Sequence, residues 1–257
     1  MRITVKIGTS SLTHPTGHLN IRKVEKLVKI LADIRNAGHE LILVSSGAIA
    51  MGVGKLHLKE RPKDIPSKQA AAAVGQCELM YTYDKLFAEY NQTVAQILLT
   101  AEDIDHEERK QNIKNTISRL LEMGALPIIN ENDTVATAEI KVGDNDTLGA
   151  VVSVCSESDL LVLMSDIDGL YNADPHRDPN AELIPLVPEI TPAIEALCGG
   201  AGTERGTGGM ITKLRAAKMV TEAGGDMVIM NSDKAELLFD LTDGKSVGTR
   251  FLGRSKK

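Results

Sequence analysis

Short apolar runs alternate along the chain with longer amphipathic stretches. Runs of strand length, rich in Val, Ile and Leu, occupy residues 3–7, 41–44, 94–98, 125–129, 160–164 and 226–230. Nearly continuous apolar runs are typical of strands that are buried on both faces, and their alternation with helical segments indicates βαβ units. The pattern therefore predicts the α/β class, with a mostly parallel sheet that carries helices on both faces.

The first amphipathic stretch predicts a helix that Asn20 caps and Gly38 terminates. Its apolar side chains follow the i, i+3, i+4, i+7 spacing of one helix face, at Val24, Leu27, Val28, Leu31 and Ile34. Further helices are expected at 67–90, 101–123, 144–155 and 206–223, and residues 59–66, with two prolines, are expected to form a surface segment. Because we find no linker between these elements, we expect a single domain over 1–257.

Composition narrows the range of partners. The chain has 257 residues, of which 42% are apolar, so it is long enough to bury a full core. A net charge of -6, 3% aromatic residues and no tryptophan do not favour a nucleic-acid partner. No run approaches the roughly 18 apolar residues of a membrane helix, and no apolar signal core follows Met1. We therefore expect a cytoplasmic protein without a membrane partner.

The three cysteines indicate neither a disulfide framework nor a zinc module. Cys77, Cys155 and Cys198 lie far apart, and there is no C-x-x-C pair. This usage fits free thiols inside a cell.

Acidic and amide side chains are concentrated in two short loops, residues 130–133 (Asn-Glu-Asn-Asp) and 143–146 (Gly-Asp-Asn-Asp). The first loop directly follows the apolar run 125–129, and ligands of open α/β sheets collect at the carboxyl ends of strands. These groups suit three tasks: holding an ammonium group, approaching a metal, or orienting lysines. The two loops are therefore expected to face a ligand, and the pattern alone leaves the three tasks open.

Glycines and lysines beside other strand ends suit an anion. Lys6 and Gly8 end the first strand, and Ser46-Gly47 leads from the second strand into a helix whose N-terminal amides could bind a phosphate. No Lys-Ser/Thr follows these glycines, so a Walker A loop is excluded, and no G-x-G-x-x-G fingerprint of a dehydrogenase is present. A strand cap at Lys6 and an unoccupied tight turn at Gly47 are the simpler alternatives.

The C-terminal half repeats this theme. Glycines are dense over 199–209, and Lys213 follows about one turn inside the next helix, where it can reach an anion. We interpret 199–209 as a loop that can close over a nucleotide. Ser165 and Asp166, at the end of the strand 160–164, suit the ribose or base, whereas Asp168-Gly169 is interpreted as a turn.

Taken together, these motifs resemble the amino acid kinase family in order and over nearly the whole chain. The motifs are 5–10 (VKIGTS), 44–49 (VSSGAI), 67–69 (SKQ), 129–133 (INEND), 143–146 (GDND), 169–171 (Gly-Leu-Tyr) and 206–210 (GTGGM). Within that family the chain resembles the members that act on glutamate. The resemblance implies a three-layer α/β/α sandwich and transfer of a phosphoryl group from ATP, with Mg²⁺, to the side-chain carboxylate of L-glutamate.

The resemblance also implies roles for single residues. Lys6 and Lys213 would flank the transferring phosphoryl group, and Asp146 would hold both lysines in place. Glutamate would be bound by Ser46, Asp133 and Asn145, with Asn130 and Asp144 close by. Mg²⁺ would be held mainly by the ATP phosphates, with no metal site of the protein's own. ATP would contact Lys6, Gly8, Gly47, Ser165, Asp166, Thr207, Gly208, Gly209, Met210, Ile211, Thr212 and Lys213.

Three further expectations come from the resemblance. Proline would act as a feedback inhibitor at the glutamate site, a glutamyl phosphate reductase would consume the labile product, and the protein would form a homo-oligomer. Many bacterial members continue into a small C-terminal PUA domain, which we expect this chain to lack.

Alternative functions stay open at this point. They are a kinase of the same fold that acts on acetylglutamate, aspartate, carbamate or a nucleoside monophosphate, and a non-catalytic nucleotide-binding protein.

Overall fold

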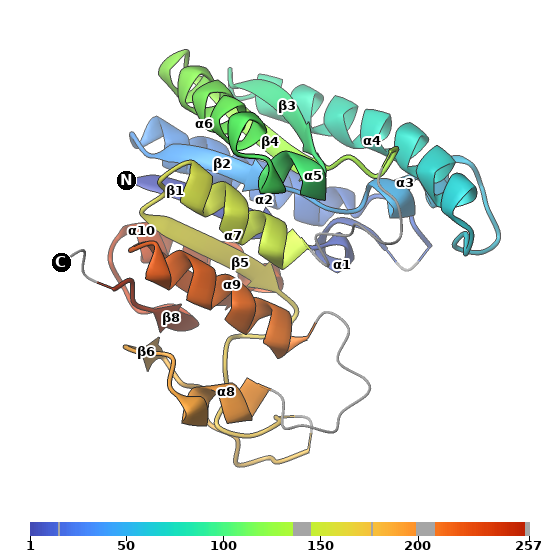
Figure 1. The fold of residues 1–257 in the computed structure, drawn as a ribbon. Helices are drawn as coiled ribbons and strands as arrows, with labels where there is room; N and C mark the ends of the chain where they lie inside the picture. Colours follow the sequence, from blue (N-terminus) through green and yellow to red (C-terminus); the bar gives the residue numbers. More distant parts are fainter. Residues whose placement is uncertain (15, 136–144, 176, 199–208, 255–257) are drawn as a thin grey trace.

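The computed structural model describes residues 1–14, 16–135, 145–175, 177–198 and 209–254 (Figure 1). Its centre is one eight-stranded sheet with the strand order β3-β4-β2-β1-β5-β7-β8-β6. The strands are β1 (Arg2–Ile7), β2 (Glu40–Val44), β3 (Thr93–Leu99), β4 (Ala125–Glu131), β5 (Leu160–Ser165), β6 (Leu186–Val187), β7 (Asp226–Asn231) and β8 (Thr249–Phe251).

The predicted parallel sheet is confirmed. β1 lies at the centre and pairs in parallel with β2 and β5, and β3, β4 and β7 continue the parallel arrangement. β8 pairs antiparallel with β7, and β6 pairs in parallel with β8, so the last two strands of the order run against the rest. These two strands have only three and two residues, which is too short for an apolar run to reveal them.

One face of the sheet is covered by α2 (Ile21–Asn36), α4 (Ile65–Ala88) and α10 (Leu237–Thr242), with α1 (Thr9–Leu12) and α3 (Ala48–Lys55) near the strand ends. Leu27, Leu31 and Tyr83 pack there in one core cluster with Val5 and Val162 of the sheet. The predicted caps of α2 are confirmed, because Asn20 accepts a hydrogen bond from the Lys23 amide at 3.3 Å. Gly38 adopts a left-handed φ of 95° just beyond the helix.

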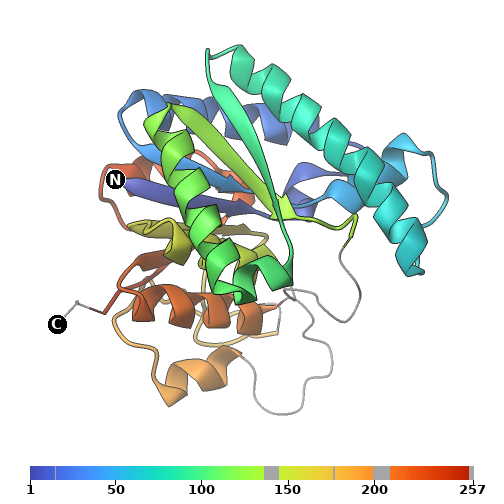
Figure 2. The same cartoon turned by 45° about the horizontal axis from the view of Figure 1, so that its top comes forward.

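The other face is covered by α6 (Glu107–Glu122), α7 (Asn145–Cys155) and α9 (Met210–Glu222), with α5 (Ala101–Asp105) and α8 (Pro192–Cys198) beside them. Two core clusters lie under this layer, one around Ile117 and Leu148 and one around Leu214. In Figure 2, α6 and α9 lie in front of the strands and α2 lies behind them. The expected three-layer α/β/α sandwich is therefore confirmed.

The predicted helix over 101–123 is wrong as a single element. It is broken at His106, whose extended backbone (ψ 115°) separates α5 from α6. A reciprocal pair of hydrogen bonds between Thr100 and Asp103 caps α5, so the short helix has its own start signal. The capping pattern was visible in the sequence, and so was the absence of apolar residues between Ile104 and Ile113.

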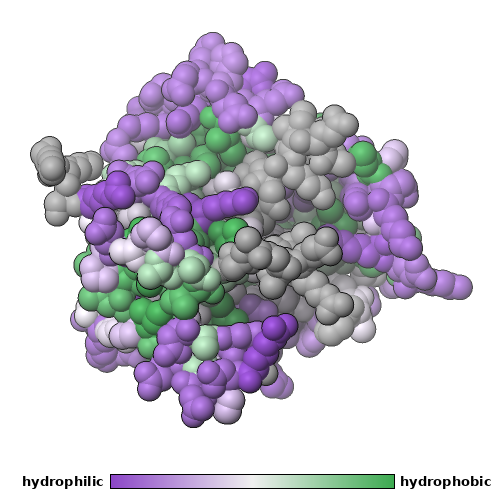
Figure 3. All heavy atoms as spheres, turned by 60° about the horizontal axis from the view of Figure 1, so that its bottom comes forward, coloured by the Kyte–Doolittle hydropathy of each residue, from purple (hydrophilic) through white to green (hydrophobic). Residues whose placement is uncertain are grey.

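The surface and the cysteines complete the description. None of the helices in the described ranges has the length and apolar character needed to cross a membrane. Figure 3 shows hydrophobic residues gathered in patches between hydrophilic ones on the face turned forward there. Cys77, Cys155 and Cys198 are all free thiols, as expected.

Candidate active site

A cavity of about 280 Å³ opens at the carboxyl ends of β1, β2 and β4, where α3 and α7 begin. Parallel strands point their carboxyl ends to one edge of a sheet, so residues distant in the sequence meet there. The described residues that line it are Lys6, Gly8, Thr9, Ser46, Gly47, Ala48, Ile49, Ala50, Arg61, Asn130, Glu131, Asp133 and Asn145. Seven of the residues proposed from the sequence are thus brought together: Lys6, Gly8, Ser46, Gly47, Asn130, Asp133 and Asn145.

Asp146, in the first turn of α7, joins the two predicted lysines. Its Oδ1 accepts from Lys6 Nζ at 2.6 Å, and its Oδ2 accepts from Lys213 Nζ at 2.9 Å. Thr212 Oγ1 donates to the same Oδ2 at 3.1 Å. All three charged side chains are buried. One carboxylate therefore fixes two ammonium groups, one from β1 and one from α9, beside the cavity.

The electrostatics of this cluster favour the ionised state of Asp146. Burial would raise the pKa of the carboxyl group, but the adjacent charges of Lys6 and Lys213, together with their hydrogen bonds, hold that pKa below its ordinary value. The cluster carries two positive charges against one negative charge. It therefore keeps a net positive charge, which an entering anion can neutralise.

Asn145 organises the neighbouring wall of the cavity. Its Nδ2 donates to the Ser45 carbonyl at 2.8 Å, to Ser46 Oγ, and more weakly to Asn130 Oδ1 at 3.4 Å. Asn130 in turn donates to Gln76 Oε1 of α4 at 2.9 Å. Hydroxyl and amide groups from β2, β4, α4 and α7 are thus held in one hydrogen-bonded network.

The N-terminus of α3 adds backbone amides to the site. Gly47 caps this helix with a left-handed φ of 97°, and no side chain caps the helix. The amides of its first turn are therefore not occupied by a capping side chain and can face an anion. α3 sits close to α4, because a Cβ at Gly75 would lie 1.7 Å from the Ala48 carbonyl oxygen. Only glycine at position 75 permits this approach.

Of the residues proposed for the nucleotide, Lys6, Gly8 and Gly47 line the cavity, whereas Ser165, Asp166 and the first turn of α9 do not. Ser165 ends β5 and donates to Asp166 Oδ1 at 3.0 Å, and Asp166 is exposed. Gly209 precedes α9, whose first turn contains Met210, Ile211, Thr212 and Lys213. Thr207 and Gly208, proposed for the nucleotide, and Asp144, proposed near glutamate, lie outside the described residues. All these proposed contacts stay predictions.

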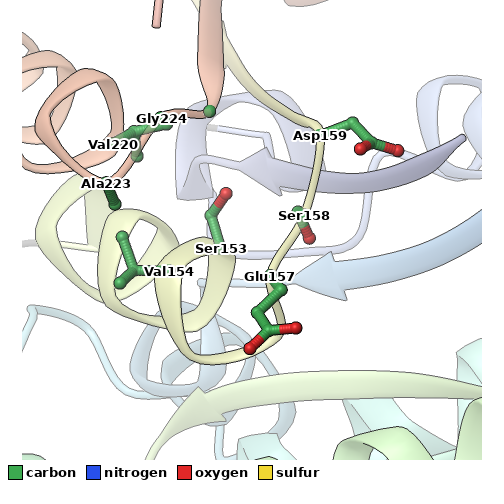
Figure 4. Close-up of a pocket in the computed structure, with 9 residues that line it drawn as sticks. Ser153, Val154, Glu157, Ser158, Asp159, Val220, Ala223 and Gly224 are labelled. Atoms are coloured by element: carbon green, nitrogen blue, oxygen red, sulfur yellow. The ribbon is translucent and has the colours of Figure 1, made fainter. Parts of the chain in front are cut away.

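A second, smaller cavity of about 130 Å³ lies between the C-terminal ends of α7 and α9, and Figure 4 shows its lining. Glu157 and Asp159 contribute carboxylates to its edge, but both are engaged. Glu157 pairs with Lys114, and Asp159 accepts from the Arg2 backbone amide at 2.7 Å. No lysine or arginine lines this cavity among the described residues, so it lacks the cationic side chains that phosphoryl transfer requires.

Six of the lining residues were not among those proposed from the sequence: Thr9, Ala48, Ile49, Ala50, Arg61 and Glu131. Arg61 is the one of these with a cationic side chain. The supporting contact of Gln76 was also missed. Gln76 supports Asn130 from the middle of α4. A polar residue on an otherwise alanine-rich helix was the available signal for Gln76; Arg61 had no such signal.

The model of the amino acid kinase family matches residues 1–231. The chain belongs to the amino acid kinase family. It is 53% identical to a glutamate 5-kinase of Clostridium acetobutylicum, over 99% of this chain and 96% of that protein. It is 57% identical to a glutamate 5-kinase of Clostridium tetani, over 97% and 93%. A glutamate 5-kinase of Carboxydothermus hydrogenoformans is 55% identical over 100% of this chain and 69% of its own length.

Solved structures show the same fold. A carbamate kinase from Giardia lamblia bound to AMP-PNP superposes with a TM-score of 0.67 at 17% identity, covering 98% of each chain. The isopentenyl phosphate kinase of T. acidophilum, in a product complex, gives a TM-score of 0.64 at 17% identity, over 98% of this chain and 100% of that one. This amino acid kinase therefore has the fold that the resemblance implied.

Proposed function

We propose that this amino acid kinase transfers the γ-phosphoryl group of ATP to the side-chain carboxylate of L-glutamate. The product would be L-glutamyl 5-phosphate, which makes this the first step of proline biosynthesis. The observation that carries the proposal is the pair of buried lysines on Asp146 beside a cavity lined with amide and hydroxyl groups. The names of the similar proteins support the substrate.

Charge decides the mechanism. A carboxylate is already ionised at neutral pH, so the acceptor needs no general base. The difficulty is that two anions must approach each other and that the transferring group carries charge on its oxygens. Lys6 and Lys213 would meet this charge from β1 and α9, and Asp146 would keep both ammonium groups in place without reorganisation.

The remaining polar groups would hold the amino acid. We propose that Asp133 binds the α-ammonium group, and that Ser46 and Asn145 position the acceptor carboxylate, with Asn130 as their support. The hydrogen bonds of Asn145 to Ser46 and Asn130 favour this assignment, because they fix the rotamers of both partners. Asp144 would lie near them.

Glycine backbone, lysines and hydroxyls would bind the nucleotide. Gly8 and Gly47 would approach the phosphates, Ser165 and Asp166 would contact the nucleoside, and Thr207 to Lys213 would cover it. Mg²⁺ fits the phosphates better than the protein cluster, because three donors already engage the carboxylate of Asp146. Mg²⁺ keeps several waters and binds through substrate phosphates in such sites, where it neutralises developing charge.

We extend the proposal to an inhibitor, to the enzyme that uses the product, and to the assembly and location of the protein. Proline carries the carboxylate and ammonium groups of glutamate's α-carbon, so we propose that it competes for the cavity. The acyl phosphate product is labile, so we propose a reductase as its consumer. We also propose a cytoplasmic homo-oligomer, whose mass sedimentation equilibrium would measure.

The test of the function is direct. The protein is mixed with ATP, Mg²⁺ and L-glutamate, and hydroxylamine traps any acyl phosphate as a hydroxamate. We expect a hydroxamate that depends on all three components and falls when proline is added. Hydroxamate formed with aspartate or acetylglutamate but not with glutamate would contradict the substrate assignment and leave the family intact.

A further inference from the structure

Arg61 is a charged residue of the cavity wall that has no role in the phosphoryl transfer proposed for this site. It comes from the exposed segment 56–64 between α3 and α4, while most of the lining comes from strand ends and helix starts. Arg61 forms no hydrogen bond or ion pair with another described residue. An arginine that lines a cavity and has no partner in the described part of the chain is available to an anionic ligand.

Comparing the cationic side chains of the cavity with the charged groups of L-glutamate indicates which anionic group Arg61 would bind. The described lining contains two cationic side chains, Lys6 and Arg61. Lys6 is buried and paired with Asp146 at 2.6 Å, so its ammonium group is fixed where the proposed function places the transferring phosphoryl group. L-glutamate brings two carboxylates and one ammonium group. The side-chain carboxylate must lie at the Lys6 end, which leaves the α-carboxylate without a cation unless Arg61 supplies one.

We propose that Arg61 binds the α-carboxylate of the substrate and so selects dicarboxylic amino acids; this inference rests on the proposed function. The guanidinium group presents two parallel N–H donors, which match the two oxygens of a carboxylate. Asp133, on the β4 side of the same cavity, is the proposed partner of the α-ammonium group. Arg61 and Asp133 together would bind the carboxylate and the ammonium group on the α-carbon. Lys6 would lie at the side-chain carboxylate that reacts.

The experiment combines a change in the enzyme with a change in the substrate. Arg61→Gln is compared with the wild-type protein on L-glutamate and on L-isoglutamine, in which a neutral amide replaces the α-carboxylate. Each compound is measured as a substrate by hydroxamate formation and as a competitive inhibitor. We expect Arg61→Gln to raise the KM for L-glutamate about tenfold to a hundredfold, as for the loss of a charge-assisted hydrogen bond. The KM for ATP and kcat should stay within about twofold.

The substrate arm separates recognition from structure. If Arg61 contacts the α-carboxylate, Arg61→Gln should change the KM or inhibition constant of L-isoglutamine by less than about twofold, because the contact is already absent. Arg61→Lys keeps the charge and should recover part of the affinity for L-glutamate. Lys63→Gln is the matched control, since it removes a positive charge from the same exposed segment but does not line the cavity.

The contradicting results are distinct. An unchanged KM for L-glutamate in Arg61→Gln, or an equal rise in Lys63→Gln, overturns the inference. A fall in kcat at constant KM also overturns it, because Arg61 would then act on the transferring group. If the wild-type protein forms no hydroxamate from L-glutamate, the proposed function itself has failed, so the two failures are distinguished by the wild-type assay alone.

Discussion

The two ends of α7 border two cavities that differ in every property relevant to catalysis. Its N-terminal end carries Asn145 and Asp146 beside the larger cavity, and its C-terminal end carries Ser153 and Val154 beside the smaller one. At the first end, helix starts and two lysines converge; at the second, two helices end. Helix N-termini favour anions and C-termini do not, so the direction of α7 alone makes the two cavities unequal.

The ion pairs at the two cavities differ as well. At the larger cavity Asp146 is buried between two lysines, and the cluster keeps a net positive charge. At the smaller cavity the ion pair of Glu157 with Lys114 is solvent-exposed, and Ser153 has a buried Oγ without a hydrogen-bond partner among the described residues. The presence of a cavity therefore does not by itself indicate a ligand-binding site. The arrangement of charges against the helix termini indicates which of the two can bind an anion.

The largest expected effect concerns the carboxylate at the N-terminal end of α7. Asp146→Asn leaves two buried ammonium groups without their counter-charge, which should lower the free energy of unfolding by about 3–5 kcal/mol. The hydroxamate assay should also lose most of its kcat. Urea unfolding followed by circular dichroism measures the first effect. A stability within about 0.5 kcal/mol of wild type would contradict the role of Asp146 as the centre of the cluster.

The second prediction concerns how the difference in free energy of unfolding between wild type and Asp146→Asn depends on pH. The pKa of Asp146 is lowered in the folded protein, so its contribution to stability is present above the ordinary carboxyl pKa of about 3.9 and is lost as pH falls through the folded value. In the folded protein Asp146 becomes protonated only below this lowered pKa, and it then resembles Asn. The stability gap between wild type and Asp146→Asn should therefore be full at pH 7 and narrow in acid. If the stability difference between the two proteins widened in acid, the pKa of Asp146 could not be lowered in the folded protein.

The smallest effect is expected at the other end of α7. Ser153→Ala removes a buried hydroxyl that has no hydrogen-bond partner among the residues described, so the free energy of unfolding should change by less than about 0.5 kcal/mol or rise slightly. kcat and both KM values should be unchanged. Thermal unfolding and steady-state kinetics measure this. A large loss of activity would mean that the smaller cavity takes part in function and that the contrast between the two cavities is false.

Much of the fold was predictable because most of the long strands are buried on both faces. The six long strands were found within two residues, since nearly continuous apolar runs mark them. β6 and β8 escaped because a strand of two or three residues depends on its neighbours rather than on its own pattern. The break at His106 was missed for another reason, because the stretch 105–112 has no apolar residue whose spacing could show where α5 ends and α6 begins.

The site was predictable to the extent that its residues sit in motifs. Lys6, Ser46 and Asn145 lie at strand ends and helix starts, which local patterns mark. The meeting of Lys6 and Lys213 at Asp146 was implied by the resemblance and not by any pattern, because Asp146 lies 140 and 67 positions from the two lysines. Arg61 was not predictable, because an exposed, proline-flanked segment carries no signal of what it faces in space.

The central claim is that lysines held by Asp146 stabilise the transferring phosphoryl group. Lys213→Ala tests it most directly, with Lys218→Ala as control, because Lys218 lies on the same helix and forms only an exposed ion pair with Glu195. We predict that Lys213→Ala lowers kcat in the hydroxamate assay about a hundredfold or more, near 3 kcal/mol, while Lys218→Ala does not. A Lys213→Ala enzyme with normal kcat and only a raised KM would contradict the claim.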